Sequence, residues 1–300
     1  MCSLFPSGNI NNSRREIEGK IGVKETIKFG IIADIQYCDC GTRGSRFYRN
    51  SLQKLEKSID DFNKEEVRFI VNLGDLVDRD TPRNLDSVLV RLGKSNVPVY
   101  NLTGNHDYDN VTNNDQLYKQ LDMPGEYYAI REDNWCSIML NTNEVSSYAN
   151  VEGTSKEVEL AKMLQKIKDE KLPNGASYNG GVSKRQIQWL KSELEKSQQD
   201  SVNTLIFSHH PIYGAEGLTA LNDLEITELL SRYPTVKGVI SGHHHPSAFG
   251  VYKDIPFITT AGMIETETEN AYGMVTIYPD KIELEGKGRT QSHSISLKKD

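Results

Sequence analysis

Short runs of apolar residues recur along the chain, and each run ends in polar residues. The segments are IKFGIIADIQ, VRFIVNLGD, VPVYNLTGNHD, NTLIFSHHP and VKGVISGHH, which begin at positions 27, 67, 97, 203 and 236. Runs of this length that are rich in Val and Ile are typical of strands buried on both faces. The pattern therefore predicts strands that deliver polar side chains at their carboxyl ends.

Helical periodicity separates these strands. Residues 48–65 carry apolar side chains at intervals of three and four, namely Leu52, Leu55, Ile59 and Phe62. Residues 181–194 contain Ser183 and Gln186 at the spacing of a helix capping box, and 221–233 are a third candidate helix. Because strands and helices alternate, we expect parallel strand pairing through right-handed crossovers.

Two regions break this alternation. Residues 126–142 and 249–286 have the pattern of antiparallel strands joined by hairpins, which predicts a mixed sheet or a second sheet. Residues 145–182 are polar around one candidate helix. We interpret them as an insertion over one face of the domain that can act as a lid.

The domain boundaries follow from the same pattern. Residues 1–26 lack apolar periodicity, and we expect them to form a flexible leader. The patterned part, 27–290, is expected to be a single domain, and 291–300 a tail.

Composition and charge narrow the class of protein. The 300 residues are 37% hydrophobic and 26% charged, as in a globular protein. The formal net charge of −7 argues against a general partner among nucleic acids or anionic membranes. No apolar run reaches the roughly 18 residues of a membrane span, and the first residues lack the apolar core of a signal peptide. We therefore expect a cytoplasmic protein, and no feature of the sequence indicates a protein partner.

The four cysteines give little sign of a metal site. They are Cys2, Cys38, Cys40 and Cys136. Only Cys38 and Cys40 are close in sequence, and one intervening residue is too few for a structural zinc knuckle. We expect reduced, unpaired thiols.

Six of the seven histidines lie at the predicted strand ends, where open α/β sheets bind ligands. The polar residues there are Asp34, Gln36, Asp75, Asn105, His106, His209, His210, His243, His244 and His245. Carboxylates, amides and imidazoles without thiolates suit Mn²⁺, Fe²⁺, Mg²⁺ or Zn²⁺. The set exceeds the needs of one ion, so the sequence predicts two divalent ions, about 3.5–4 Å apart, that share a carboxylate.

The order of these motifs resembles a known family. D-x-Q, GDLVDR, GNHD, SHHP and GHHH, from Asp34 to His245, are similar to the five-block signature of the calcineurin-like metallophosphoesterases. The family pattern is D-x-H, GD-x-x-D, GNH-[DE], H and GH-x-H, and the resemblance extends over about residues 27–289. It implies an α/β fold, a four-layer sandwich of two mixed β-sheets flanked by helices.

The resemblance also implies a role for each site residue. One metal would be bound by Asp34, Gln36 and His245. The other would be bound by Asn105, His209 and His243. Asp75 would bridge the two ions. His209 falls at the position of the family's single His, and His210 stays open as the alternative ligand. His106 would meet the phosphoryl group or the leaving oxygen, and Asp107 would orient its imidazole.

Gln36 stands where most of the family has His. An amide oxygen is a harder donor than imidazole, which favours Mn²⁺ or Mg²⁺ over Zn²⁺. With its neighbours ADIQY and GTRGSRFYRNSL, Gln36 resembles the manganese-dependent ADP-ribose/CDP-alcohol diphosphatase branch. That resemblance implies a small nucleotide diphosphate as substrate, attack of a metal-bound hydroxide on one phosphorus, and departure of the other phosphate assisted by His106.

Candidate substrate contacts follow the first metal loop. Arg43 and Arg46 can neutralise a second phosphate, and Tyr37 or Tyr108 can stack on a base. Two alternatives to the diphosphatase stay open. One is a cyclic nucleotide phosphodiesterase or phosphomonoesterase of the same family, and the other is a non-catalytic binding module that keeps the fold.

Overall fold

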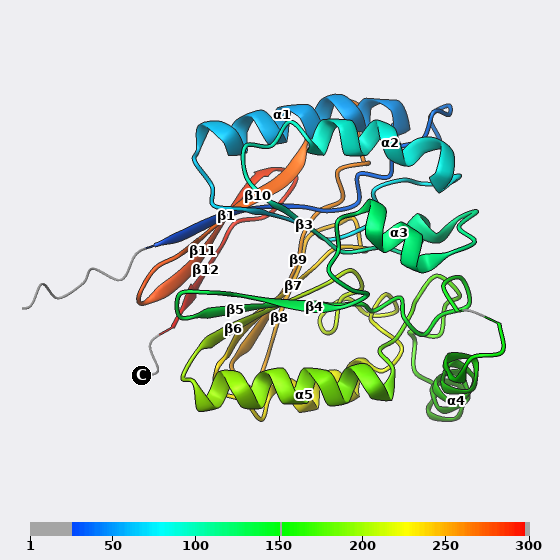
Figure 1. Ribbon diagram of the computed structural model, residues 1–300, viewed down its shortest axis with the longest axis vertical. Helices are drawn as coiled ribbons and strands as arrows, with labels where there is room; N and C mark the ends of the chain where they lie inside the picture. Colours follow the sequence, from blue (N-terminus) through cyan, green and yellow to red (C-terminus); the bar gives the residue numbers. More distant parts are fainter. Residues whose placement is uncertain (1–25, 151, 298–300) are drawn as a thin grey trace, which may run out of the picture.

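Two six-stranded β-sheets pack face to face in the computed structural model, which describes residues 26–150 and 152–297 (Figure 1). The first sheet contains, in spatial order, β12 (His293–Ser296), β11 (Lys281–Gly288), β10 (Ala271–Ile277), β1 (Ile27–Ile32), β2 (Ile70–Asn72) and β3 (Val99–Asn101). The second contains β4 (Tyr128–Glu132), β5 (Trp135–Leu140), β6 (Asn203–Ser208), β7 (Val236–Ser241), β9 (Ile255–Thr259) and β8 (Ala248–Tyr252).

Helices cover the outer face of each sheet. The first sheet is covered by α1 (Ser51–Lys64) and α2 (Thr81–Leu92), and the second by α5 (Lys184–Gln199) and α6 (Asp223–Leu230) (Figure 1). The remaining helices are α3 (Asn114–Gln120), α4 (Ser155–Glu170) and two 3₁₀ turns, Tyr48–Asn50 and His106–Tyr108. The expected four-layer α/β architecture of two mixed sheets flanked by helices is confirmed.

The apolar positions recognised in the sequence form the packing between these layers. Leu55, Ile59 and Phe62 of α1 are fully buried against the first sheet. Phe62 lies directly over Gly30 of β1, where an added Cβ would come within 2.8 Å of the ring, so the close packing of helix on strand needs glycine there.

Aromatic side chains join the two sheets. The Phe29 ring of β1 stacks on Phe69 with 4.8 Å between centroids, and it meets Phe207 of β6 edge-on at 5.9 Å. These contacts place one hydrophobic core between the inner faces of the sheets. A second cluster lies between β5, β6 and the helices α5 and α6.

The strand directions bring the polar strand ends together. β1 pairs with β2 and β2 with β3 in parallel, and in the second sheet β5, β6, β7 and β9 are likewise parallel in that order. The five strands predicted from the sequence are therefore divided between two sheets. The expected antiparallel hairpins are confirmed as β4–β5, β8–β9 and β10–β11.

The sheet continues past the boundary predicted at residue 290. The predicted tail, 291–300, contains β12, which pairs antiparallel with β11 and places His293 opposite Leu284. The sequence does not reveal this strand, because a four-residue edge strand in which half-buried and exposed side chains alternate leaves almost no apolar pattern. Residues 1–25 of the predicted leader lie outside the described residues.

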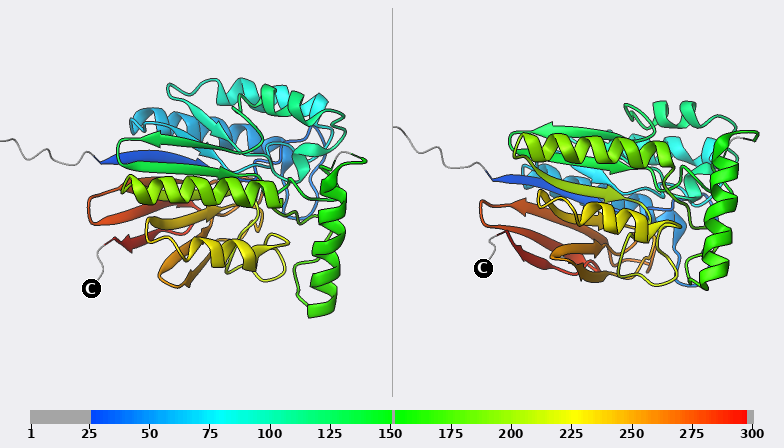
Figure 2. Two further views of the ribbon diagram at one scale, coloured as in Figure 1. Left: turned by 60° about the horizontal axis from the view of Figure 1, so that its bottom comes forward. Right: turned by 90° about the horizontal axis from the view of Figure 1, so that it is seen from below.

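Figure 2 shows α4 projecting at one end of the molecule, with most of its surface away from the sheets. It belongs to the predicted insertion, 145–182, and Ile167 is its buried residue. Among the residues that the structure describes, no helix combines the length and apolar character that crossing a membrane requires.

Candidate metal centre

The predicted ligands meet where the loops after five strands converge. Asp34 and Gln36 follow β1, Asp75 follows β2 and Asn105 follows β3, while His209 follows β6 and His243 and His245 follow β7. A carboxylate oxygen of Asp34, one of Asp75 and a ring nitrogen of His209 all lie within 4.8 Å of one another. Residues from both sheets thus contribute to one site.

The backbone of these loops adopts an unusual conformation. Five predicted ligands have positive φ, with values of 51° at Asp34, 42° at Gln36, 55° at Asp75, 67° at His243 and 65° at His245. Left-handed backbone is uncommon for residues other than glycine and clusters at functional sites. The loops are therefore held in a conformation that directs the side chains inwards at the expense of local stability.

Gly104 makes room for the most central of these residues. A Cβ built on Gly104 would lie 2.1 Å from Oδ1 of Asp75 and 2.4 Å from its backbone nitrogen. No side chain fits between the two loops. The glycine of the GNHD motif is thus required by the close approach of the loops after β2 and β3.

One group of donors surrounds Asp75 on the side of the second sheet. His209 Nε2 lies 3.2 Å from Asn105 Oδ1, 3.2 Å from His243 Nδ1 and 3.6 Å from Asp75 Oδ2. Two imidazole nitrogens, an amide oxygen and a carboxylate oxygen are thus turned towards a common region. This is a donor set that suits a divalent transition-metal ion.

The other group contains Asp34, Gln36 and His245. His245 Nε2 lies 3.8 Å from Asp34 Oδ1, and the Gln36 Nε2 group donates a hydrogen bond of 2.8 Å to Asp75 Oδ2. Oε1 of Gln36 is buried, and within the described part of the chain it has no hydrogen-bond partner. Since an unpaired buried amide oxygen is costly, this atom fits a bound cation better than it fits a metal-free site.

Each of the three histidines has an acceptor at its outer nitrogen. His209 Nδ1 lies 2.9 Å from the Leu73 carbonyl oxygen, and His245 Nδ1 lies 2.7 Å from Glu265 Oε1. His243 Nε2 lies 3.2 Å from Asn179 Oδ1. Because these oxygens can only accept, they hold the ring proton and leave the lone pair of the opposite nitrogen for a metal.

His210 differs from its neighbour His209 because both of its ring nitrogens are engaged elsewhere. Nε2 donates to the Tyr178 carbonyl oxygen at 3.1 Å, and Nδ1 accepts from Thr142 Oγ1 at 2.9 Å. Burial, together with the neighbouring His209, lowers the pKa of His210 to about 3. The geometry therefore favours His209 as the ligand between the two histidines left open by the sequence.

Two buried carboxyl groups dominate the electrostatics of the site. Burial and the neighbouring Asp75 raise the pKa of Asp34 well above its usual range. Burial opposes ionisation of Asp75 as well, but the neighbouring His209 and His106 and the hydrogen bond from Gln36 outweigh it and lower the pKa of that carboxyl. Burial also lowers the pKa of His209 and His243, which keeps these rings neutral and able to bind metal.

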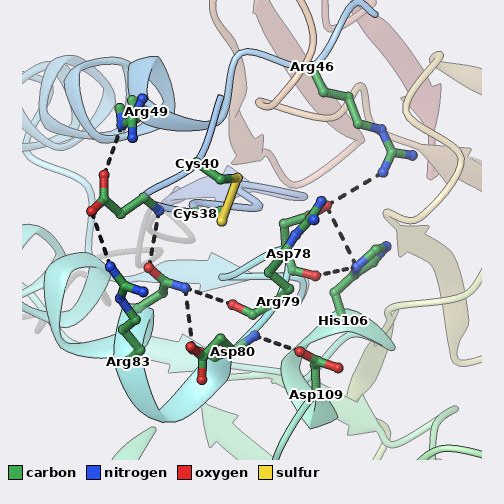
Figure 3. The surroundings of a disulfide bond; sticks show 12 residues. Cys38, Cys40, Arg46, Arg49, Asp78, Arg79, Asp80, Arg83, His106 and Asp109 are labelled. Atoms are coloured by element: carbon green, nitrogen blue, oxygen red, sulfur yellow. Dashed lines mark hydrogen bonds and ion pairs between the residues drawn. A yellow bond between two sulfur atoms is a disulfide. The ribbon is translucent and has the colours of Figure 1, made fainter. Parts of the chain in front are cut away.

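His106 lies at the edge of this site and is oriented by Asp78 (Figure 3). Its Nδ1 donates to the Asp78 carbonyl oxygen at 2.7 Å and lies 3.7 Å from Asp78 Oδ1. Burial disfavours the imidazolium, but Asp75 and Asp78 outweigh this effect and raise the pKa of His106. The ring is therefore held with Nε2 as its remaining proton-transfer atom.

Asp107 does not have its predicted role of orienting His106. Its Oδ1 accepts from the backbone nitrogens of Leu76 and Val77 at 2.8 and 3.1 Å, and its Oδ2 accepts from Gly104 at 2.8 Å. Consecutive residues in a 3₁₀ turn point in directions about 120° apart, so Asp107 faces the loop of Asp75 instead. Burial and Asp75 raise the pKa of Asp107 to about 7.

A cavity of about 610 Å³ opens beside the two donor groups. Its wall includes Arg46, His106, Tyr178, Leu218 and His244. Arg46 lies between two acids, with NH1 3.6 Å from Asp78 Oδ1 and Nε 3.8 Å from Glu265 Oε1. The wall therefore combines charged and polar side chains with the apolar surfaces of Tyr178 and Leu218.

Of the four predicted substrate contacts, only Arg46 lines this cavity. Arg43 is exposed but lies outside the cavity wall. Tyr37 and Tyr108 are 9% and 5% exposed and belong to the hydrophobic core, which corrects the prediction that they stack on a base. The hydroxyl of Tyr108 is hydrogen-bonded to Thr103 and Tyr118. The sequence could not distinguish these core tyrosines from surface ones because both kinds follow polar motifs.

Three residues of the site were missed from the sequence. Tyr178 and Asn179 lie in the loop that follows α4, and Glu265 follows β9, a strand expected in an antiparallel hairpin and not at the edge that forms the site. Tyr178 and Asn179 precede Gly180 and Gly181, and this NGG turn before the capping Ser183 is the one local signal that could have drawn attention to them.

The loop after Gln36 contains a disulfide between Cys38 and Cys40, whose Cα atoms are 5.2 Å apart (Figure 3). This corrects the expectation of reduced thiols for these two residues, whereas Cys136 is free and buried. Cys38 packs with Tyr48 and Ile264. The bond thus lies next to the segment that carries Gln36 and, further along, Arg46.

Comparison with known proteins identifies relatives over most of the chain. Residues 27–247 match the family model described as calcineurin-like phosphoesterase. A manganese-dependent ADP-ribose/CDP-alcohol diphosphatase from Xenopus tropicalis is 28% identical, over 89% of this chain and 93% of the relative, and one from Homo sapiens is 28% identical, over 91% and 93%. The crystal structure of a dimetal phosphatase from Danio rerio is similar with a TM-score of 0.82 and 26% identity, over 91% of this chain and 99% of that one.

Proposed function

Because this chain belongs to the calcineurin-like phosphoesterase family, we propose that it is a manganese-dependent hydrolase of ADP-ribose and CDP-alcohols. The family resemblance inferred from the five motifs is confirmed. The named activity of the Xenopus and human relatives supports a small nucleotide diphosphate as the substrate. The products would be a nucleoside monophosphate and a phosphorylated sugar or alcohol.

The observation that carries the proposal is the division of the donors into two groups around Asp75, next to a cavity that holds His106 and Arg46. Asp34, Gln36 and His245 would hold one ion, and Asn105, His209 and His243 the other. When bound, two such ions lower the pKa of a coordinated water and neutralise negative charge on the phosphoryl group. The oxygen donor of Gln36 favours manganese over zinc in the first position.

His106 is the general acid of this proposal. Its Nδ1 proton is held by the Asp78 carbonyl oxygen, so Nε2 is the atom that gives a proton to the departing phosphate oxygen as its bond to phosphorus breaks. The raised pKa of His106 increases the fraction of imidazolium near neutral pH. Because the ring is already oriented, little reorganisation is needed during the reaction.

The cavity wall supplies contacts for the rest of the substrate. The Arg46 guanidinium can bind the second phosphate, because it is fixed between Asp78 and Glu265 and remains 35% exposed. Tyr178 is 48% exposed and, with Leu218, offers an apolar surface for a base or a sugar. These contacts suit a ligand with a charged diphosphate and an apolar ring.

The proposal is tested by hydrolysis of ADP-ribose and CDP-choline with metal-stripped protein to which Mn²⁺, Mg²⁺ or Zn²⁺ is restored separately. Release of AMP or CMP that is greatest with Mn²⁺ is expected. An Asp75→Asn variant is expected to lose several orders of magnitude in turnover, because it removes the shared carboxylate.

The remaining candidate functions give different outcomes in the same assay. Turnover of bis-p-nitrophenyl phosphate or of a cyclic nucleotide without release of AMP from ADP-ribose would support a phosphodiesterase of the same family. Failure to turn over any of these compounds with any of the three metals would support the non-catalytic binding module.

A further inference from the structure

Asn179 lies near the end of segment 145–182 and contacts the metal centre from outside the strand-end loops. Its side chain is 2% exposed, and Oδ1 lies 3.2 Å from His243 Nε2. No strand motif of the sequence includes it. It is therefore a polar residue buried by an insertion, directly behind a candidate metal ligand.

The orientation of the Asn179 amide is fixed by two other contacts. Nδ2 donates to the Asn174 carbonyl oxygen at 2.9 Å and to the Gly217 carbonyl oxygen at 3.0 Å. Carbonyl oxygens cannot donate, so a flipped amide would place its own oxygen against both of them. Oδ1 must therefore face His243.

An oxygen acceptor at Nε2 determines where His243 carries its proton. A neutral imidazole has one N–H, and here it donates from Nε2 to Asn179 Oδ1. The lone pair then resides on Nδ1, which lies 3.2 Å from His209 Nε2 on the side of the metal centre. The opposite tautomer can donate from Nδ1 to His209 Nε2, but it places two lone pairs against each other at Asn179 and a proton where a metal has to bind.

We propose that Asn179 is a positioning residue that selects the Nε2–H tautomer of His243 and thereby sets the affinity of the second metal position. The inference rests on the proposed function only in taking His243 as a ligand. Outer hydrogen-bond partners of metal-binding histidines typically contribute 10–100-fold to metal affinity. Through this contact, the insertion that carries α4 influences the metal centre without supplying a ligand.

The first readout needs neither metal nor substrate. In metal-free protein labelled with ¹⁵N-histidine, two-dimensional NMR of the imidazole nitrogens should show His243 chiefly as the Nε2–H tautomer. In an Asn179→Leu variant the ring should shift towards the Nδ1–H tautomer, which donates to His209 Nε2. A wild-type spectrum with the proton of His243 on Nδ1 would overturn the inference without any variant.

The second readout is direct Mn²⁺ binding, followed by the electron paramagnetic resonance signal of the free ion. Asn179→Leu is expected to weaken one of two equivalents by 10–100-fold and to leave the other within about twofold. If the variant bound each of the two Mn²⁺ equivalents as tightly as the wild type does, the inference would be overturned. This binding experiment contains no substrate, so its result does not depend on whether the protein hydrolyses ADP-ribose. A failed hydrolysis assay would count against the proposed function alone.

Asn174 provides the matched control. It is also a 2% exposed asparagine of the same segment, and its Nδ2 donates to the Ala220 carbonyl oxygen at 2.8 Å. Asn174→Leu perturbs the packing of the segment, but it keeps the backbone carbonyl that accepts from Asn179, and its side chain does not contact His243. It is expected to keep both Mn²⁺ affinities and the Nε2–H tautomer. Equal losses in both variants would show that only the packing of the segment matters.

Discussion

At the residue scale, Asp78 links the two cationic side chains that face the cavity. His106 comes from the loop after β3 and Arg46 from the loop after β1, and both lie within 4 Å of Asp78 atoms (Figure 3). Asp78 is almost fully buried, so its charge is poorly screened by solvent. Asp78 thus positions both His106, which would donate a proton to the leaving phosphate, and Arg46, which would bind the second phosphate.

His106→Gln should reduce turnover of ADP-ribose by about 10²–10⁴-fold, because glutamine keeps the size of the side chain but cannot give a proton to the leaving phosphate. The fall of kcat at alkaline pH, where His106 loses its proton, should also be absent from the variant. Steady-state kinetics of ADP-ribose hydrolysis over a range of pH measures both changes. His293→Gln is the control, since this histidine lies in β12 and stacks on Phe249. A variant that keeps the alkaline fall of the wild-type profile would contradict the acid role.

Arg46→Gln should raise KM for ADP-ribose by about tenfold, because a charge-assisted contact to a phosphate contributes roughly 1.5–3 kcal/mol. Hydrolysis of bis-p-nitrophenyl phosphate, which has no second phosphate, should be affected less. Arg43→Gln is a matched control, because Arg43 pairs with Arg46 through the backbone but does not line the cavity. If Arg43→Gln raised KM more than Arg46→Gln did, Arg43 and not Arg46 would be the phosphate contact.

At the element scale, α1 does more than cover the first sheet. Lys54, which is 5% exposed, donates from Nζ to the carbonyl oxygens of Met263, Glu265 and Thr266. These three bonds use all the donors of an ammonium group. They hold the loop from which Glu265 reaches His245 and Arg46, so a helix on the outside of the fold supports the position of a residue in the site.

Lys54→Met should lower the free energy of unfolding by about 2–4 kcal/mol, because it leaves three carbonyl oxygens without their donor. Urea unfolding followed by circular dichroism measures the change. Lys57→Met on the same helix is the control, since Lys57 is exposed and substitutions there are expected to stay within about 0.5 kcal/mol. Similar losses in both variants would argue for a general effect on α1.

The capping signal of α5 shows what the sequence could and could not predict. Ser183 accepts from the Gln186 backbone nitrogen, as the capping-box spacing predicts. The side chain of Gln186 does not complete the box. It bonds the backbone of Asn141, and Glu144 takes its place at the nitrogen of Ser183. Local spacing identified the helix start, but a partner 39 positions away in the chain leaves no local signal.

The other helices also differ in how far the sequence alone predicts them. The periodicity of Leu85, Val88 and Leu92 is sufficient to predict α2, although it was not among the three helices expected. α3 has seven residues, which is too short for a clear period. The strand ends were predictable because each followed an apolar run. Asn179 was not, because tertiary packing alone brings its loop to the site. Glu265 was not, because the hairpin pattern of its region did not indicate that β9 lies parallel to β7. The lid role of 145–182 stays a prediction.

At the scale of the whole molecule, the candidate ligands are divided between the two sheets. Asp34, Gln36, Asp75 and Asn105 follow strands of the first sheet, while His209, His243 and His245 follow strands of the second. Each ion position takes donors from both sheets. A bound ion would therefore join the two halves of the sandwich at one end.

Mn²⁺ should accordingly raise the midpoint of thermal unfolding by several degrees. Binding at 100 times the dissociation constant stabilises the folded state by about 2.7 kcal/mol for each site. Part of this gain comes from neutralising the buried pair of Asp34 and Asp75. Differential scanning calorimetry of metal-stripped protein with and without Mn²⁺ measures the shift. Asp75→Asn should lose most of it, and an unchanged shift in that variant would argue against a shared carboxylate.

The left-handed backbone of the ligand loops has a consequence for protein engineering. Asp34, Gln36, Asp75, His243 and His245 each adopt a conformation that glycine adopts at no steric cost, and each strained residue costs on the order of 1 kcal/mol. Glycine at these positions would relieve that strain in the metal-free chain, but it would also remove the stabilisation that bound Mn²⁺ provides. A redesign that considers the metal-free chain alone would select against the site, so these five positions are the ones to keep fixed when the sequence is redesigned for stability.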